Sequence, residues 1–286
     1  MTSLPVRQQW TPERAAFVQS LLNEFPMYET RSELPSGFYI GMPLFMQDGR
    51  TLRISHSEEL NKTGEEYGLE PGVISFCDRS QVKTINVNNW VRNDEGRRRG
   101  GLGTPLRGSK TLVVNLSGLV DLSGVSLSIP SGIFNSGSLH IHGGTGEGFT
   151  FLVGGNDASE DNMLKIYLST PLPFDLGSDT LVTIQSNIYK CQKVVSVADQ
   201  RVVRTGTPTT RVPNGDYYWN ITEGPAIAEA GGIIAAASTA VGVNKDGKLT
   251  APSASYPNFA TIKEYTAAAG ATIASGTHIP IWIHGK

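Results

Sequence analysis

The chain has 286 residues, of which 39% are hydrophobic and 17% are charged, a composition typical of a folded protein and not of a disordered one. Its 24 basic and 26 acidic residues give a formal net charge of -2, which argues against a main role in binding nucleic acid or anionic lipid, because such proteins carry a net basic field. Two cysteines, Cys77 and Cys191, are too few and too widely spaced for a disulfide framework or a thiolate metal cage.

The N-terminal sequence MTSLPVRQQW contains neither an apolar core segment nor a small-residue cleavage site, so we expect no signal peptide. No apolar run approaches the ~20 residues that a membrane-spanning helix needs. We therefore expect a protein that is made in a reducing cytoplasm, where both cysteines remain free thiols.

One helix is predicted near the N-terminus. Thr11 is a suitable N-cap, Pro12 suits the first helical position, and Pro26 ends the helix. The apolar side chains of this segment follow helical spacing and form one stripe, which consists of Phe17, Val18, Leu21, Leu22 and Phe25. Because so short a helix is marginal alone, the stripe must pack either on its own domain or on a neighbouring subunit.

Beyond the helix the apolar pattern changes to a period of two residues, which is typical of strands. Residues 37–46 and 51–55 predict a hairpin, with Asp48 and Gly49 in its turn. Further strands are expected at 72–77, 82–91, 111–116, 125–129, 138–142, 149–153, 164–168 and 181–189. Their spacing of roughly ten residues, with turn-forming residues between them, predicts β-sandwich or barrel modules with long loops, and hence a mainly β protein with one short amphipathic helix.

The amino-acid composition changes after Cys191, where Ala, Gly and Thr dominate. We therefore predict an N-terminal arm at 1–35, a β-rich central domain at 36–192 and a smaller β domain at 193–286. In an alternative arrangement strands 37–55 complete the third region, and the middle of the chain is an insertion into it. The Ser-Gly pairs between 117 and 137 recur at irregular intervals, which argues against a solenoid.

Residues 103–111, GTPLRGSKT, approach the pattern of a phosphate-binding loop. Ser109 separates the second glycine from the lysine, and a strand is expected where the true motif opens a helix. This departure argues against nucleotide binding.

Two other patterns contain groups that can hold a metal ion. His140 and His142 lie on one face of an expected strand and can bind a transition metal if a third ligand, such as Glu147 or Asp157, converges on them. The alternative is a pair of surface or core-edge histidines. The acidic loop from Asp157 to Asp161 can hold calcium, but it lacks the spacing of a calcium-binding loop, which favours a solvated turn.

No grouping of nucleophile and base, or of paired carboxylates, stands out as a catalytic site. We therefore predict no catalytic residues, no cofactor and no enzymatic activity.

A glycine-rich cationic segment, residues 93–108, reads NDEGRRRGGLGTPLRG. Such a loop can be ordered by an acidic protein surface, whereas nucleic acid is less favoured because no aromatic residues interleave the arginines. A solvated surface loop is the alternative. In this segment the predicted partner-binding residues are Arg97, Arg98, Arg99 and Arg107. The apolar stripe of the N-terminal helix is predicted to bind the partner as well.

The segment 212–251 resembles a module of tailed-bacteriophage virion proteins, in which a Gly-Tyr-x-Trp strand leads through a Gly-Pro-Ala turn to Gly- and Ala-rich strands and an Asp-Gly turn. The hairpin at 35–54 resembles the opening strands of such modules. The residues that carry the resemblance are Gly215, Tyr217, Tyr218, Trp219, Gly224, Pro225, Ala226, Gly231, Gly232, Asp246 and Gly247. The arginine-rich loop and the long central segment have no counterpart in the module.

This family includes capsid decoration, or cement, proteins. The resemblance therefore implies a β-rich structural virion protein on the capsid exterior, bound to the major capsid protein and to itself as a homotrimer, without nucleic acid or membrane. The alternative is a tail-associated or carbohydrate-binding β module, whose exposed aromatic face would consist of Trp90, Tyr167, Tyr217, Tyr218 and Trp219. A polysaccharide-degrading enzyme stands third and requires two carboxylates in one groove.

Overall fold

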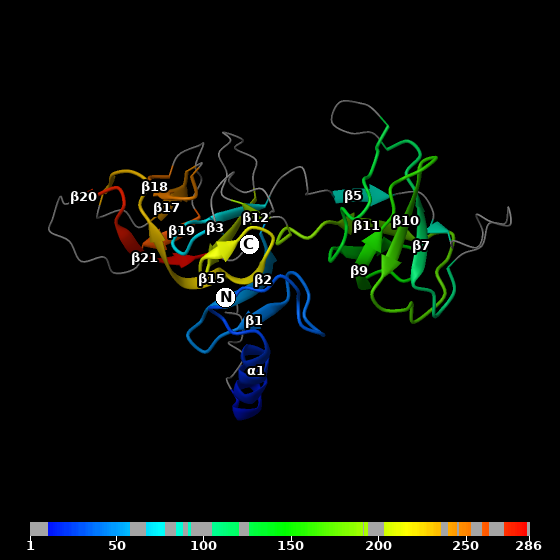
Figure 1. Ribbon diagram of the computed structural model, residues 1–286. Coiled ribbons are helices and arrows are strands. Elements are labelled where there is room, and N and C mark those ends of the chain that lie inside the picture. The colour runs from blue at the N-terminus through cyan, green and yellow to red at the C-terminus, as the bar shows by residue number, and fades with distance from the viewer. Residues whose placement is uncertain are drawn as a thin grey trace, which may run out of the picture. The chain divides into compact units, whose positions relative to one another are not determined.

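The computed structural model describes residues 11–57, 67–77, 84–87, 91–92, 105–119, 126–190, 192–193, 203–235, 240–244, 246–252, 259–262 and 272–284 (Figure 1). These ranges contain one short helix near the N-terminus and a series of strands paired in antiparallel ladders, which confirms the prediction of a mainly β protein. No helix within them has the length and apolar character that a membrane span requires.

The chain divides into two compact units. Unit 1 combines Met1–Asp78 with Tyr189–Lys286, and unit 2 is the continuous segment Arg79–Ile188. This division differs from the boundaries 1–35, 36–192 and 193–286 and follows the alternative arrangement, in which the middle of the chain is an insertion. The reason is a long-range pairing, because β2 (Thr51–His56) forms a ladder with β15 (Tyr217–Glu229) and so joins both ends of the chain in unit 1.

Unit 1 is built on a ten-stranded sheet whose central order is β12-β4-β13-β15-β21-β19-β17-β18, with β2 also on β15 and β1 on β2. Two short pairs complete it, β3 with β14 and β16 with β20. The remaining strands of unit 1 are β1 (Pro43–Phe45), β3 (Tyr67–Leu69), β4 (Ser75–Cys77), β12 (Gln192–Lys193), β13 (Val203–Pro208), β14 (Val212–Pro213), β16 (Ile234–Ala235), β17 (Ala240–Val243), β18 (Leu249–Thr250), β19 (Ala260–Ile262), β20 (Thr272–Ile273) and β21 (His278–Ile283).

The longest strand, β15, changes its partner half-way. Tyr217 to Glu223 pair with β2, and Gly224 to Glu229 pair with β21. Gly224 sits at the change with φ of 93°, and a Cβ there would lie 2.4 Å from the carbonyl oxygen of Gly49. Glycine is therefore required for this close approach of two backbones.

The helix α1 (Pro12–Glu24) packs on unit 1. Its N-cap prediction is confirmed, because the Thr11 side chain accepts a hydrogen bond from the main-chain nitrogen of Arg14. Val18 and Phe25 are buried in the core of this unit, and the Phe25 ring lies 5.6 Å from that of Trp219. In Figure 1 the helix extends away from the sheet, with its C-terminal end near β1.

Unit 2 contains one seven-stranded antiparallel sheet that covers its own apolar core. In β8, Leu139 and Ile141 are buried while His140 between them is exposed, which is the alternation that a sheet with one solvated face requires. The expected strand at 125–129 is irregular at 127–129, although Ile129 is buried. In sheet order the strands are β5 (Thr84–Val87), β11 (Leu181–Gln185), β8 (Ser138–Gly143), β9 (Thr150–Asn156), β10 (Met163–Leu168), β7 (Thr111–Asn115) and β6 (Val91–Arg92).

Candidate functional site

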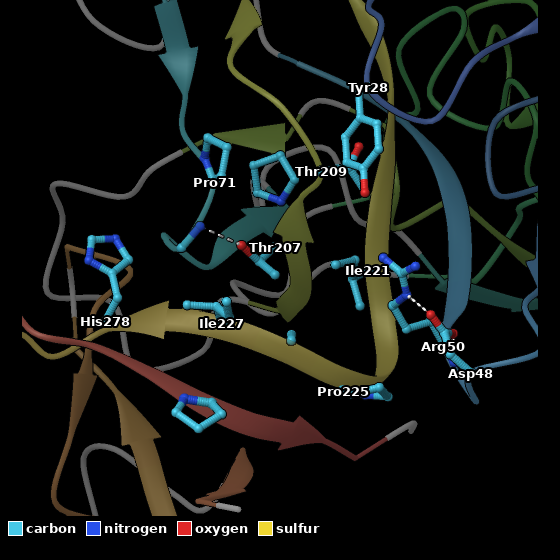
Figure 2. Close-up of a pocket in the computed structure, with 14 residues that line it drawn as sticks. Tyr28, Asp48, Arg50, Pro71, Thr207, Thr209, Ile221, Pro225, Ile227 and His278 are labelled. Carbon is cyan, nitrogen blue, oxygen red and sulfur yellow. Dashed lines mark hydrogen bonds and ion pairs between the residues drawn. The ribbon is translucent and has the colours of Figure 1, made fainter. Parts of the chain in front are cut away.

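An open groove of about 580 Å³ crosses the surface of unit 1 along β15 and is called here the β15 groove (Figure 2). It lies between the segment that follows α1, the turn between β1 and β2, the turn that precedes β4, and the strands β13 and β21. The residues that define it are Tyr28, Asp48, Arg50, Pro71, Gly72, Thr207, Pro208, Thr209, Ile221, Pro225, Ala226, Ile227, His278 and Pro280.

Four prolines line the groove, namely Pro71, Pro208, Pro225 and Pro280. Proline has no main-chain N–H, so these positions cannot donate a hydrogen bond to the backbone of an occupant. Their rings are also rigid, so little side-chain entropy is lost when they are covered. The lining therefore favours an occupant that presents apolar side chains over one that adds a strand.

Two large apolar side chains stand exposed in the groove. Tyr28 is 65% exposed and Ile227 is 59% exposed. Large apolar side chains left exposed in one groove are typical of interaction sites, where aromatic side chains contribute strongly to affinity.

The main chain that carries Tyr28 is fixed on both sides. The hydroxyl of Thr209 lies within hydrogen-bonding distance of the carbonyl oxygen of Met27, and the main chains of Arg31 and Tyr217 exchange hydrogen bonds of 3.0 and 2.7 Å. Tyr28 is thus presented by a fixed backbone, which reduces the ordering needed when a partner binds.

The ion pair of Asp48 and Arg50 lies at one end of the groove and His278 at the other, as Figure 2 shows. At one end Arg50 Nε contacts Asp48 Oδ2 at 2.7 Å, and the main-chain nitrogen of Arg50 donates to Asp48 Oδ1 at 3.0 Å. At the other end the imidazole of His278 packs against Gly72, where a Cβ would lie 3.0 Å from the ring. The carboxylate of Asp48 is thus paired with the guanidinium of Arg50.

The structure corrects the prediction that the whole helix stripe contacts a partner. Val18 and Phe25 are buried in the core of unit 1, and Leu21 and Leu22 are packed partly against it, because the helix docks on its own unit. Phe17 differs from the others and is 60% exposed. Of the stripe, it is the residue that remains open to a partner.

Of the four arginines predicted to contact a partner, the structure describes Arg107. Arg97, Arg98 and Arg99 lie outside the described residues. Arg107 lies in an exposed turn of unit 2, where its main-chain nitrogen donates a hydrogen bond of 2.7 Å to Asp175. The turn leads into β7, so a strand follows the glycine-rich segment as expected.

A third ligand for His140 and His142, on which a metal site of three side chains depends, is not found among the described residues. In the described ranges no three His, Cys, Asp or Glu side chains come together as a metal site, so Glu147 and Asp157 do not join His140 and His142. The carboxylate of Asp157 instead accepts a hydrogen bond of 2.7 Å from the Tyr167 hydroxyl, and this bond raises the pKa of that hydroxyl.

The aromatic face expected for sugar binding does not form. Tyr218 and Trp219 are fully buried in unit 1, and the Tyr217 ring packs 4.5 Å from that of His56. Tyr167 belongs to unit 2, and Trp90 lies outside the described residues. Buried rings cannot stack on a sugar, so this observation argues against the carbohydrate-binding alternative.

Comparison of the chain with protein-family models, with curated proteins and with solved structures finds no match. Function therefore has to be inferred from the residues of the two units. Sequence reasoning missed Tyr28 and Ile227, because a tyrosine after a helix and an isoleucine in an alternating strand are both ordinary. The one sequence feature that pointed to the groove was the number of prolines in and beside predicted strands.

Proposed function

We propose that this protein is a structural virion protein that binds the outer surface of a phage capsid and stabilises the shell by bridging capsid subunits. The β15 groove is the observation that carries the proposal, because it presents exposed Tyr28 and Ile227 on a rigid β body. The resemblance of segment 212–251 to virion modules supports the choice of a capsid as the partner. A protein that binds only the assembled shell stabilises it by mass action.

The occupant that suits the groove is an extended apolar segment of the major capsid protein. Covering an isoleucine or a tyrosine of this kind contributes about 1.5–3 kcal/mol through the hydrophobic effect. A single contact of this size is weak. In a homotrimer several such contacts act together, since each bound copy raises the effective concentration of the next.

The test is co-sedimentation of the purified protein with capsids that were assembled without it. We expect binding at a fixed ratio to capsid subunits, and a loss of at least about tenfold in affinity for the double variant Tyr28→Ala/Ile227→Ser, from the burial estimate above. Ile233→Ser is the matched control, because Ile233 is 74% exposed and does not line the groove. Failure to co-sediment, or equal loss in the control, would contradict the proposal.

A further inference from the structure

The outer face of the sheet of unit 2 carries two histidines on one strand. His140 is exposed and His142 is half-buried on β8, while Leu139 and Ile141 point into the core on the opposite face. Residues two apart on a strand share a face and lie roughly 6.6 Å apart at their Cα atoms. Two long side chains at this spacing can reach one ion.

Each imidazole is held by a threonine hydroxyl from a neighbouring strand. His140 Nδ1 lies 2.9 Å from the hydroxyl of Thr150 on β9, and His142 Nδ1 lies 3.0 Å from the hydroxyl of Thr183 on β11. Thr150 and Thr183 both stand opposite His140 in the ladders, one on each side. Both rings therefore use Nδ1 for these contacts, and Nε2 is the nitrogen left to face a ligand.

The tautomer of His142 follows from counting protons. The hydroxyl of Thr183 has one proton, which it donates to Asn86 Oδ1 at 3.2 Å. It can then only accept from His142, so Nδ1 of that ring carries the proton and Nε2 carries a lone pair. Metal-binding histidines use this arrangement, in which a partner fixes one ring nitrogen and orients the other.

We propose that His140 and His142 bind one late first-row divalent metal ion through their Nε2 atoms. Imidazole is a ligand that Zn²⁺, Ni²⁺ and Cu²⁺ all accept. The described residues supply these two ligands, and water fills the remaining coordination positions. Thr183 acts as a positioning residue and Asn86 fixes the direction of its hydroxyl proton. The site belongs to unit 2 and is independent of the proposed capsid binding.

The test uses the full chain without a polyhistidine tag, titrated with NiCl₂ by calorimetry. We expect one Ni²⁺ per chain, with paramagnetic broadening of amide signals centred on β8 and its neighbours. The double variant His140→Gln/His142→Gln should lose this binding. The matched control His278→Gln/His284→Gln removes the same number of imidazoles from unit 1 and should bind like the wild type. Equal binding by the two double variants would overturn the site.

A second series tests the positioning role of Thr183. Thr183→Val removes the hydroxyl and should weaken Ni²⁺ binding by about tenfold, the scale typical of residues that orient a metal ligand. Thr183→Ser restores the hydroxyl and should restore affinity. Circular dichroism establishes that each variant is folded. If the valine and serine variants bind equally well, Thr183 does not position His142.

Discussion

The indole Nε1–H of Trp219 donates a hydrogen bond of 2.9 Å to the main-chain carbonyl oxygen of Phe25, although the two residues are 194 positions apart. Both residues are fully buried. The bond joins the chain that leaves α1 to the N-terminal part of β15, beside the segment that carries Tyr28. The helix therefore docks on the core of unit 1, and the exposed Phe17 of the helix and the buried Phe25 that caps its C-terminus have different roles.

Phe25→Ala is expected to destabilise unit 1 by about 3–5 kcal/mol, the range for a buried phenylalanine whose removal leaves a cavity. Phe17→Ala changes an exposed side chain of the same helix and should alter the free energy of unfolding by less than about 0.5 kcal/mol. Urea unfolding followed by tryptophan fluorescence measures both values. Similar losses in the two variants would show that the helix does not dock as described.

Unit 2 is expected to fold on its own, since Arg79–Ile188 is continuous and encloses its own apolar core. Unit 1 should also survive removal of this segment. Cys77 Sγ donates to the carbonyl oxygen of Lys190 at 3.3 Å, so the two chain ends are adjacent and a short glycine linker can join them.

Circular dichroism and calorimetry of the two separate proteins provide the measurement. Each should show a cooperative thermal transition. If either piece is unfolded while the full chain is folded under the same conditions, that unit depends on the other for its stability and is not an independent domain.

The local features of this fold could be predicted from the sequence. Thr11, Pro12 and the apolar stripe fix the start and the inner face of α1, and the alternation around His140 fixes which face of β8 is buried. These signals arise from neighbours in the chain, where capping and side-chain periodicity act directly.

The candidate groove could not be predicted in the same way. It depends on the pairing of β2 with β15 and on the docking of the segment after α1, and both contacts join residues far apart in the chain. Local propensity does not determine which strands meet. The burial of Tyr218 and Trp219 has the same origin. In the sequence these residues look like an exposed aromatic face, but their strand pairs on both edges near the centre of a sheet, where its side chains are covered.

Gly224→Ala is expected to destabilise unit 1 by at least about 1 kcal/mol, because the native φ of 93° is unfavourable for alanine and the new Cβ would meet the backbone of Gly49. Gly232→Ala is the control, since no atom lies within 4 Å of the Cβ it would add. Urea unfolding compares the two variants. Equal stabilities would show that β15 can change its partner without glycine.

Burial raises the pKa of the Tyr218 hydroxyl well above its ordinary range, and the neighbouring hydroxyls of Ser75 and Ser55 offset this only in part. The unfolded chain releases this proton near pH 10, whereas the folded chain keeps it. Above pH 10 the folded state thus holds more protons than the unfolded state, and stability falls as the pH rises. The contribution is complete below pH 10 and declines by about 1.4 kcal/mol per pH unit above it.

Tyr218→Phe should remove this part of the alkaline loss. The free energy of unfolding, measured in urea between pH 8 and 11.5, should decline less steeply in the variant. Above pH 10 the difference between the two slopes should correspond to about one proton. Burial also raises the pKa of Tyr189, so some decline remains in the variant, and the difference between the two slopes isolates Tyr218. Parallel curves would mean that water reaches the Tyr218 hydroxyl in the folded protein.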